Sequence, residues 1–359
     1  MSPDPILPKE PVYGSNNWYY AYGKSSYDDI MTDARIIAEL AGQNKNKPFM
    51  VIDDGWSVNS CAGPWRPNEK YGDMKKIADE FKGIGLKPGI WFRPLHDKEA
   101  EANHPEWLIN RTVNGNETVK FLDPSNPEVA AYLRENVRRI ISWGYQLIKH
   151  DFSTNDLFGN FGFSLNGMIT NAENWSFYNK TKTGAEITLD LYRLIREEAK
   201  DCILIGCNTI SHLSAGMVEL FRTGDDTSGR VWSRTRAYGV NTLAFRLCQN
   251  RSFYMVDADC VGVLNNYIDW KLNRQWLDLL ARSGSPLFVS IQPKMLNDEN
   301  RGDLIEAFKR NSIQQEVAEP LDWLYNNAPQ TWLIDGETIE YDFVMDSYPE
   351  LIKNRIQPY

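Results

Sequence analysis

Eight short apolar runs recur along the chain, and most of them are followed by a segment with the pattern of a helix. The runs at 49–56 and 145–152 are apolar at first and become polar toward their C-terminal ends, which is typical of buried parallel strands. The runs cover residues 17–22, 49–56, 87–93, 145–152, 202–207, 217–222, 251–257 and 286–290. This alternation predicts an α/β fold of the (β/α)8 TIM-barrel class over residues 15–314. An open doubly wound dinucleotide fold is disfavoured, because no GxGxxG motif follows any of the runs.

Capping residues mark the helix starts between these runs. Ser26 stands shortly before Asp28, and Asn126 precedes Pro127, so both positions have the composition of a helix N-terminus. Between the fifth and sixth strands the chain is too short for a regular helix. The predicted helices cover residues 26–42, 73–81, 126–144, 183–198, 234–248, 269–282 and 301–310.

Three segments fall outside the strand–helix repeat. Residues 1–14 carry four prolines and predict an extended leader on the surface. The polar and aromatic segment 153–182 is longer than an ordinary connection, and such loops tend to be functional. Residues 315–359 contain strand-like patches at 331–334 and 338–343 but are too short for a β-sandwich. We expect a short C-terminal β-rich extension there, either a hairpin or the remnant of a β accessory domain.

Charge and composition narrow the class of partner. The net charge of −9 and the lack of a basic run argue against nucleic acid and an anionic membrane surface as partners. Twelve Trp, seventeen Tyr and fifteen Phe are more aromatics than a core needs, and such rings stack on sugar faces. No apolar run is long enough to cross a membrane, and no signal peptide is visible. The compartment (cytoplasmic, or secreted or periplasmic if a signal was removed) and the oligomeric state remain open, and the five cysteines are expected to be free thiols.

In a barrel, the C-terminal ends of the strands meet at one mouth, where active sites lie. The side chains expected at that mouth are Trp18, Asp53, Asp54, Arg93, Lys149, Asp151, Cys207, Arg222, Asp225, Asp226, Asp257 and Asp259. Clustered acids also bind Mg²⁺ or Ca²⁺, but the histidines lack metal-ligand spacing, and Lys149 and Arg222 can neutralise the acids. We therefore expect neither a metal nor another cofactor.

Two carboxylates on different strands suit glycoside hydrolysis, in which one acid attacks the sugar and a second protonates the leaving oxygen. Asp151 is the candidate nucleophile, and Lys149, two residues earlier on the same strand, is expected to keep its pKa low. Asp225 and Asp226 compete for the acid role. The adjacent carboxylates and burial are expected to push the pKa of the acid upward.

Six motifs in order give the chain a family resemblance over roughly residues 14–300. They are Asp53-Asp-Gly-Trp56, His104-Pro-Glu-Trp107, Leu122-Asp-Pro-Ser-Asn-Pro-Glu128, Trp143-Gly-Tyr145, Lys149-His-Asp151 and Arg222-Thr-Gly-Asp-Asp226. Together they resemble the melibiase-type α-galactosidases of glycoside hydrolase families 27 and 36. The resemblance implies a retaining, metal-free hydrolase that acts on a terminal α-galactoside. It also implies that Asp151 is the nucleophile and that Asp226, four residues after Arg222, is the acid/base.

The resemblance further implies how the sugar is held. Asp53 and Asp54 would bind the 4- and 6-hydroxyls of galactose, and Lys149 would reach the 3- and 4-hydroxyls. Near the 2-hydroxyl and the walls, the further substrate-binding candidates are Trp18, Trp56, Cys207, Arg222, Asp225 and Asp259. Trp91 is expected to belong to the barrel core.

Two positions depart from the family pattern. Arg93 stands where family 36 commonly has a glutamate, and Asn208-Thr-Ile-Ser follows Cys207 in place of a glycine-rich run. Arg93 is kept as a substrate-binding candidate. Because these positions border the 2-hydroxyl and the leaving group, related specificities stay open: α-N-acetylgalactosaminidase, β-L-arabinopyranosidase or galactosyl transferase. An alternative from another class is a barrel that binds a galactoside without turning it over.

Overall fold

The barrel strands run parallel around one ring. The computed structural model describes residues 4–113, 116–117, 120–159, 172–173, 175–265 and 267–343. Its main sheet has the order β12-β11-β10-β8-β3-β2-β1-β14-β13, and every neighbouring pair is parallel. The strands are β1 (Tyr13–Asn16), β2 (Phe49–Ile52), β3 (Lys87–Phe92), β8 (Leu147–His150), β10 (Ile203–Gly206), β11 (Leu220–Arg222), β12 (Met255–Asp257), β13 (Cys260–Val263) and β14 (Leu287–Ile291).

The two ends of this sheet are joined by the chain itself. Only Ala258 and Asp259 separate β12 from β13, so these two strands are halves of one broken seventh strand. The first half pairs with β11 and the second half with β14, which closes a ring of eight strand positions. Asp259, at the break, has a positive φ of 74°. The structure thus confirms the predicted (β/α)8 barrel.

The first strand differs from the prediction. Residues 17–22 were expected to be extended, but Trp18–Ala21 form the short helix α1, and the strand is β1, which begins two residues inside the predicted leader. The aromatic residues favour a strand by propensity, yet helical spacing lets Trp18 pack on Tyr22, with ring centroids 5.1 Å apart. Gly14 permits the close approach to β2, because a Cβ there would lie 1.9 Å from the carbonyl oxygen of Phe49.

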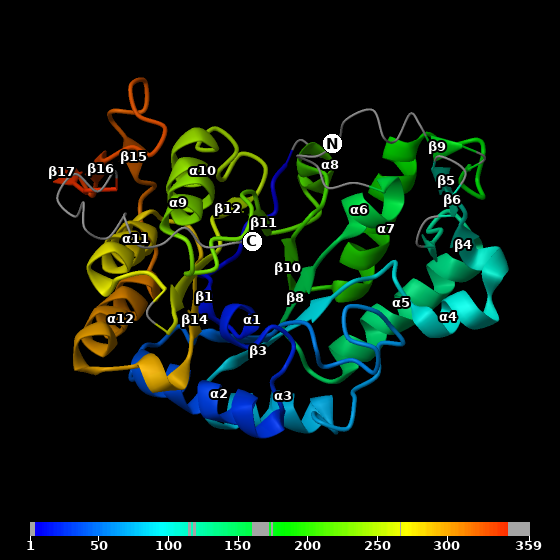
Figure 1. Ribbon diagram of the computed structural model, residues 1–359, viewed down its shortest axis with the longest axis horizontal. Coiled ribbons are helices and arrows are strands. Elements are labelled where there is room, and N and C mark those ends of the chain that lie inside the picture. The colour runs from blue at the N-terminus through cyan, green and yellow to red at the C-terminus, as the bar shows by residue number, and fades with distance from the viewer. Residues whose placement is uncertain are drawn as a thin grey trace.

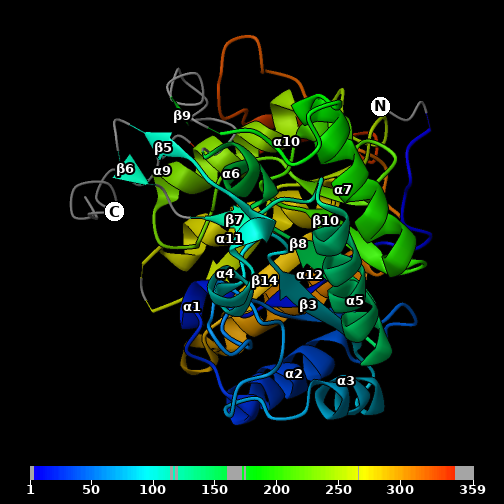
Figure 2. The same ribbon diagram turned by 90° about the vertical axis from the view of Figure 1, so that its right-hand side faces the viewer.

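Helices cover the outside of the ring, as Figures 1 and 2 show for α2, α3, α5 and α12. The predicted caps of two helices are present: Ser26 forms a capping box with Asp29, and the Asn126 side chain accepts from the amide of Glu128. The outer helices are α2 (Tyr27–Ala41), α3 (Met74–Gly83), α5 (Pro127–Ser142), α7 (Gly184–Ala199), α11 (Trp270–Arg282) and α12 (Asp298–Asn311).

Two connections are irregular. Between β10 and β11 the chain forms only the four-residue helix α8 (Ser211–Ser214), which agrees with the short spacing in the sequence. The predicted helix 234–248 is composite: α9 (Trp232–Arg234), a π-helical segment (Thr235–Val240) and α10 (Asn241–Phe245). The wider π turn brings Gly239 against Trp276, where a Cβ would lie 2.8 Å from the indole.

Several short helices and strands follow the third and fourth barrel strands, β3 and β8. After β3 come α4 (Lys98–Asn103), a 3₁₀ turn (Pro105–Trp107), β4 (Leu108–Ile109), β5 (Thr112–Val113), β6 (Asn116–Glu117) and β7 (Phe121–Leu122). The long segment 153–182 begins with the helix α6 (Ser153–Phe158) and includes β9 (Ala172–Glu173). Residues 160–171 and 174 of that segment lie outside the described residues.

The C-terminal extension is an antiparallel sheet of β15 (Glu319–Pro320), β16 (Thr331–Ile334) and β17 (Glu337–Glu340), which lies beside α11 and α12 (Figure 1). Asp335 and Gly336 join β16 to β17, and both have positive φ, as a tight hairpin turn requires. The predicted β-rich extension is therefore present. The second predicted patch ends earlier than expected, because residues 341–343 are not a strand, although Phe343 is fully buried. Among the described residues, no helix has the length and apolar character needed to cross a membrane.

Candidate active site

A cavity of about 220 Å³ lies at the C-terminal ends of the barrel strands. It is lined by Trp18, Asp53, Asp54, Cys61, Trp91, Lys149, Asp151, Phe152, Cys207, Asn208, Asp225 and Asp226. Eight of these are residues that the sequence placed at the site: Trp18, Asp53, Asp54, Lys149, Asp151, Cys207, Asp225 and Asp226. Strands at both sides of the ring thus bring the predicted acids together in one place.

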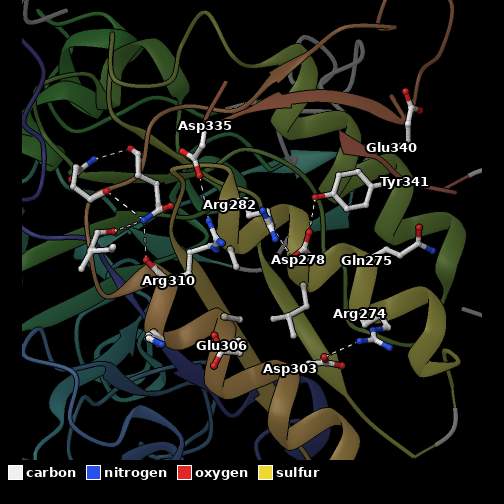
Figure 3. Close-up of a pocket in the computed structure, with 17 residues that line it drawn as sticks. Arg274, Gln275, Asp278, Arg282, Asp303, Glu306, Arg310, Asp335, Glu340 and Tyr341 are labelled. Carbon is white, nitrogen blue, oxygen red and sulfur yellow. Dashed lines mark hydrogen bonds and ion pairs between the residues drawn. The ribbon is translucent and has the colours of Figure 1, made fainter. Parts of the chain in front are cut away.

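A larger hollow lies elsewhere, on the outer face. It has a volume of about 900 Å³ and lies between α11, α12 and the hairpin of β16 and β17 (Figure 3). Its arginines are already paired with its acids: Arg274 with Asp303, Arg282 with Asp278, and Arg310 with Asp335. Size alone therefore does not identify the site, and the smaller cavity carries the converging carboxylates.

Asp151 is held by three neutral donors. Its Oδ1 accepts from the amide of Phe152 and from Asn208 Nδ2, both at 2.7 Å. Its Oδ2 accepts from Trp91 Nε1 at 3.0 Å. The carboxylate is thus fixed in orientation, and Oδ2 is the oxygen with fewer donors.

The lysine before Asp151 contacts a different acid from the one we predicted. Lys149 Nζ lies 2.8 Å from Asp53 Oδ2, and both side chains are buried. β8 ends at His150, so Asp151 lies beyond the strand, where side chains no longer alternate strictly. Burial disfavours the Lys149 cation, but Asp53, Cys207 and Asp151 together outweigh burial and raise the pKa of Lys149 well above its ordinary value.

The tandem acids after β2 are fixed by a tight turn. Asp53 also accepts from Asn16 Nδ2 at 2.6 Å, while Asp54 accepts from the amides of Gly55 and Cys61. Burial raises the pKa of Asp54 above its ordinary value, although these amides act against the rise. Gly55 is required by packing, because a Cβ there would lie 2.5 Å from the carbonyl oxygen of Gly23.

Arg222 joins Asp226 to the broken seventh strand. Its Nη2 contacts Asp226 Oδ1 and its Nη1 contacts Asp259 Oδ1, both at 2.7 Å. The Asp226 side chain is 45% exposed, whereas the side chains of Arg222 and Asp259 are 5% exposed. Asp259 also accepts from the Thr227 amide at 2.8 Å and from the hydroxyl of Tyr19. The predicted residues Arg222 and Asp259 thus support the cavity from behind rather than lining it.

The electrostatics of Asp226 differ from the expected upward shift. Burial favours the neutral acid, but the charge and hydrogen bond of Arg222, together with Lys149 and Tyr19, outweigh burial, and the pKa of Asp226 lies below its ordinary value. The neighbouring Asp225 has a cation of its own, since Arg234 Nη2 lies 2.8 Å from Asp225 Oδ2. The ion pair, not the adjacent carboxylate, therefore dominates at Asp226.

The two remaining predicted contacts do not line the cavity. Arg93 forms a bidentate ion pair with the buried Asp156, at 2.7 and 2.9 Å, and its guanidinium lies 4.3 Å from the ring centroid of Phe152. Trp56 is fully buried and donates from Nε1 to the carbonyl oxygen of Trp91 at 2.9 Å. Each of them supports a residue that does line the cavity.

Four lining residues were not predicted as contacts. Trp91 was assigned to the core, yet its indole N–H reaches Asp151; its place near the end of the third strand was the available signal. Asn208 directly follows Cys207, and its side-chain amide donates to Asp151. The backbone of Asn208 is left-handed, with φ 48°. Phe152 follows Asp151 in the sequence. Cys61 comes from a loop, and no pattern in the sequence marks it.

Removing the acid that pairs with Arg93 will destabilise the fold. In Asp156→Asn the buried guanidinium loses its counter-ion, and we expect a loss of about 3–5 kcal/mol in unfolding free energy. The matched control is Glu99→Gln, which breaks the exposed Arg66–Glu99 pair (side chains 57% and 50% exposed) and should cost at most about 1 kcal/mol. Urea unfolding of both variants measures the difference. Equal losses would contradict the role assigned to the Arg93–Asp156 pair.

Among the described residues, no group of three or more His, Cys, Asp or Glu side chains forms a metal-binding cluster.

A comparison with curated proteins found no match. Solved structures with the same fold include an α-galactosidase from Thermus thermophilus in complex with p-nitrophenyl α-D-galactopyranoside. It has a TM-score of 0.68 and 21% identity, over 94% of this chain and 68% of that one.

Two further structures come from Geobacillus stearothermophilus. A family 36 α-galactosidase has a TM-score of 0.64 and 18% identity, over 91% of this chain and 46% of that one, so this chain spans under half of its length. A family 27 β-L-arabinopyranosidase in complex with arabinose has a TM-score of 0.61 and 16% identity, over 86% of this chain and 78% of that one. The melibiase family model matches residues 12–198, just over half of the sequence. By that match, the chain belongs to the melibiase family of glycoside hydrolases.

Proposed function

We propose that the protein is a retaining, exo-acting glycoside hydrolase that removes terminal α-galactose by double displacement. The observation that carries the proposal is the state of Asp151, a cavity-lining carboxylate that three neutral donors hold in one orientation. A second carboxylate, Asp226, lines the same cavity and is nearly half exposed. Retaining hydrolysis uses two carboxylates at one site, one as the nucleophile and the other as the acid/base.

The two steps use these groups in turn. Asp151 Oδ2 attacks the anomeric carbon, the bond to the leaving oxygen breaks, and Asp226 gives its proton to that oxygen. The product of this step is a β-galactosyl ester of Asp151. Asp226 then takes a proton from water, the water oxygen attacks the anomeric carbon, and the ester bond breaks to release α-galactose and the Asp151 carboxylate.

The proton on Asp226 depends on the substrate in this proposal. In the free protein Arg222 keeps the pKa of Asp226 low. A sugar in the cavity covers the exposed side of the carboxylate and removes water from it, which favours the neutral acid. The sugar thus promotes the protonation state that its own cleavage requires.

Recognition of galactose rests on the buried charges of the cavity. Asp53, Asp54 and Lys149 would bind the 4-, 6- and 3-hydroxyls, and the Trp18 ring would form an apolar wall. The cavity volume of about 220 Å³ suits a single sugar ring, which supports exo action on a terminal residue. Structures with this fold have been solved with p-nitrophenyl α-galactoside, stachyose and raffinose, all of them galactosides.

The test is the anomer that is released first. Hydrolysis of 4-nitrophenyl α-D-galactopyranoside, followed by proton NMR, should give α-galactose before mutarotation produces the β form. A parallel panel of α-N-acetylgalactosaminide, β-L-arabinopyranoside and β-galactoside measures specificity. Release of β-galactose first would replace the retaining mechanism with an inverting one, and no turnover across the panel would overturn hydrolysis altogether.

A further inference from the structure

A row of side chains in mutual contact leads away from the wall of the cavity. Trp18 lines the cavity, and its ring lies 5.1 Å from that of Tyr22. The Arg230 guanidinium lies 4.6 Å from the Tyr22 ring centroid and 4.8 Å from that of Tyr267. These contacts therefore run from the cavity wall to an arginine that lies against two tyrosine rings.

Arg230 belongs to the same loop as the candidate acid/base, four residues after Asp226. This loop is fastened to the seventh strand: Thr227 donates to Asp259 and to the carbonyl oxygen of Cys260. Gly229 packs so closely on that strand that a Cβ would lie 2.5 Å from the Cα of Gly262. Arg230 Nη2 also donates to the carbonyl oxygen of Tyr19 at 3.2 Å. The guanidinium is thus positioned before any ligand arrives.

Among the described residues, Arg230 has no carboxylate as an ion-pair partner. Asp226 and Asp225 are paired with Arg222 and Arg234, whereas no ion pair joins Arg230 to a described carboxylate. Its guanidinium lies against the rings of Tyr22 and Tyr267, and the edge of the guanidinium carries the N–H donors that a ligand can use. A planar edge of N–H donors matches a carboxylate in geometry and charge.

We propose that Arg230 forms a leaving-group subsite for a carboxylate-bearing aglycone, such as a uronic acid or another acid linked to the galactose. The inference rests on the proposed function, because the leaving oxygen lies on the side from which Asp226 gives its proton. Arg230 is the next cation along that loop, and the Trp18–Tyr22 contact connects it to the cavity wall. The subsite selects by charge, because the N–H edge of Arg230 pairs with a carboxylate and gains far less from a neutral group.

The test compares two aryl galactosides of nearly equal shape. The probes are 4-carboxyphenyl and 4-carbamoylphenyl α-D-galactopyranoside, and the readout is the ratio of their kcat/KM values. We expect the wild type to prefer the carboxylate by roughly tenfold, the size of one partly exposed charge-assisted contact. In Arg230→Gln the ratio should fall to about one. Arg246→Gln removes an exposed arginine from the end of α10 and should keep the wild-type ratio.

Salt provides a readout that does not depend on any variant. The wild-type ratio should decline as the ionic strength rises from about 0.02 to 0.5 M, because the contact is partly screened. A ratio near one in the wild type, a ratio that salt does not change, or an unchanged ratio in Arg230→Gln would overturn the subsite. If the wild type hydrolyses neither probe, the proposed function fails and the subsite fails with it; equal hydrolysis of both overturns the subsite alone.

Discussion

Replacing Asp151 with glycine will lower kcat for hydrolysis of 4-nitrophenyl α-galactoside by about 10⁴-fold or more, because no other group forms the glycosyl ester. Azide will then restore turnover. The glycine leaves a space where the carboxylate was, and the small anion attacks the anomeric carbon from the same side. The product to identify by NMR is β-galactosyl azide, which shows both the position of the nucleophile and its direction of attack.

The matched variant is Asp151→Asn. It keeps the shape of the side chain and can keep the contact with Asn208, but it supplies no nucleophile and leaves no room for azide. We expect it to be inactive with and without azide. Rescue to an α-galactosyl azide, or full activity of Asp151→Gly, would be incompatible with Asp151 as the nucleophile.

The second large effect concerns Asp226 and depends on the leaving group. Asp226→Asn should lower kcat/KM by roughly 10²–10⁴-fold for an alkyl α-galactoside, whose leaving oxygen needs a proton. The loss should be much smaller for 2,4-dinitrophenyl α-galactoside, whose leaving group departs without one. Asp225→Asn is the matched control, because Asp225 lines the same cavity but is paired with Arg234. If Asp225→Asn shows the leaving-group dependence and Asp226→Asn does not, Asp225 is the acid/base instead of Asp226.

The pH dependence of kcat/KM tests the acid role of Asp226 independently. Asp226 must be protonated to act as the acid, and the pKa of Asp226 in the free protein is below its ordinary value. As pH rises through that lowered pKa, the acid form is lost, so kcat/KM for the alkyl galactoside should decrease toward high pH. Asp226→Asn should remove that decrease, and a profile that keeps it would assign the limb to another group.

Much of the architecture was predictable because strand ends in a parallel barrel meet at one mouth. That rule places Asp53, Asp54, Asp151 and Asp226 together from their positions after apolar runs, and the structure has them around one cavity. Only the first half of the seventh strand lies within a predicted run, 251–257; the second half, Cys260–Val263, and the break at Asp259 were not predicted. A break of this kind depends on contacts with Arg222 and Tyr19, which come from distant parts of the chain.

What the sequence could not show is which partner each charge finds. Lys149 was placed beside Asp151 by spacing along one strand, but the long side chain reaches Asp53 of another strand. Arg93 was expected at the sugar because its own strand ends there, and its counter-ion Asp156 lies on a helix 63 residues later. The contacts of Asp151 with the indole of Trp91 and the amide of Asn208 were not predicted, because neutral donors leave no charge pattern in the sequence. Pairing across the barrel is a tertiary property that periodicity does not contain.

The contact between Tyr19 and Asp259 spans 240 residues, and it bears on when the protein becomes active during folding. Asp259 lies in the last third of the chain, yet it orients the arginine that holds Asp226. Helices such as α2 and α5 can form from local contacts, whereas this arrangement waits for α1, which follows the first strand, to reach the seventh strand. During synthesis, a chain without its last strands can therefore contain Asp151 and Asp226 and still lack an ordered acid/base. Galactoside turnover would then appear later in refolding than helical circular dichroism, which makes activity a direct reporter of ring closure.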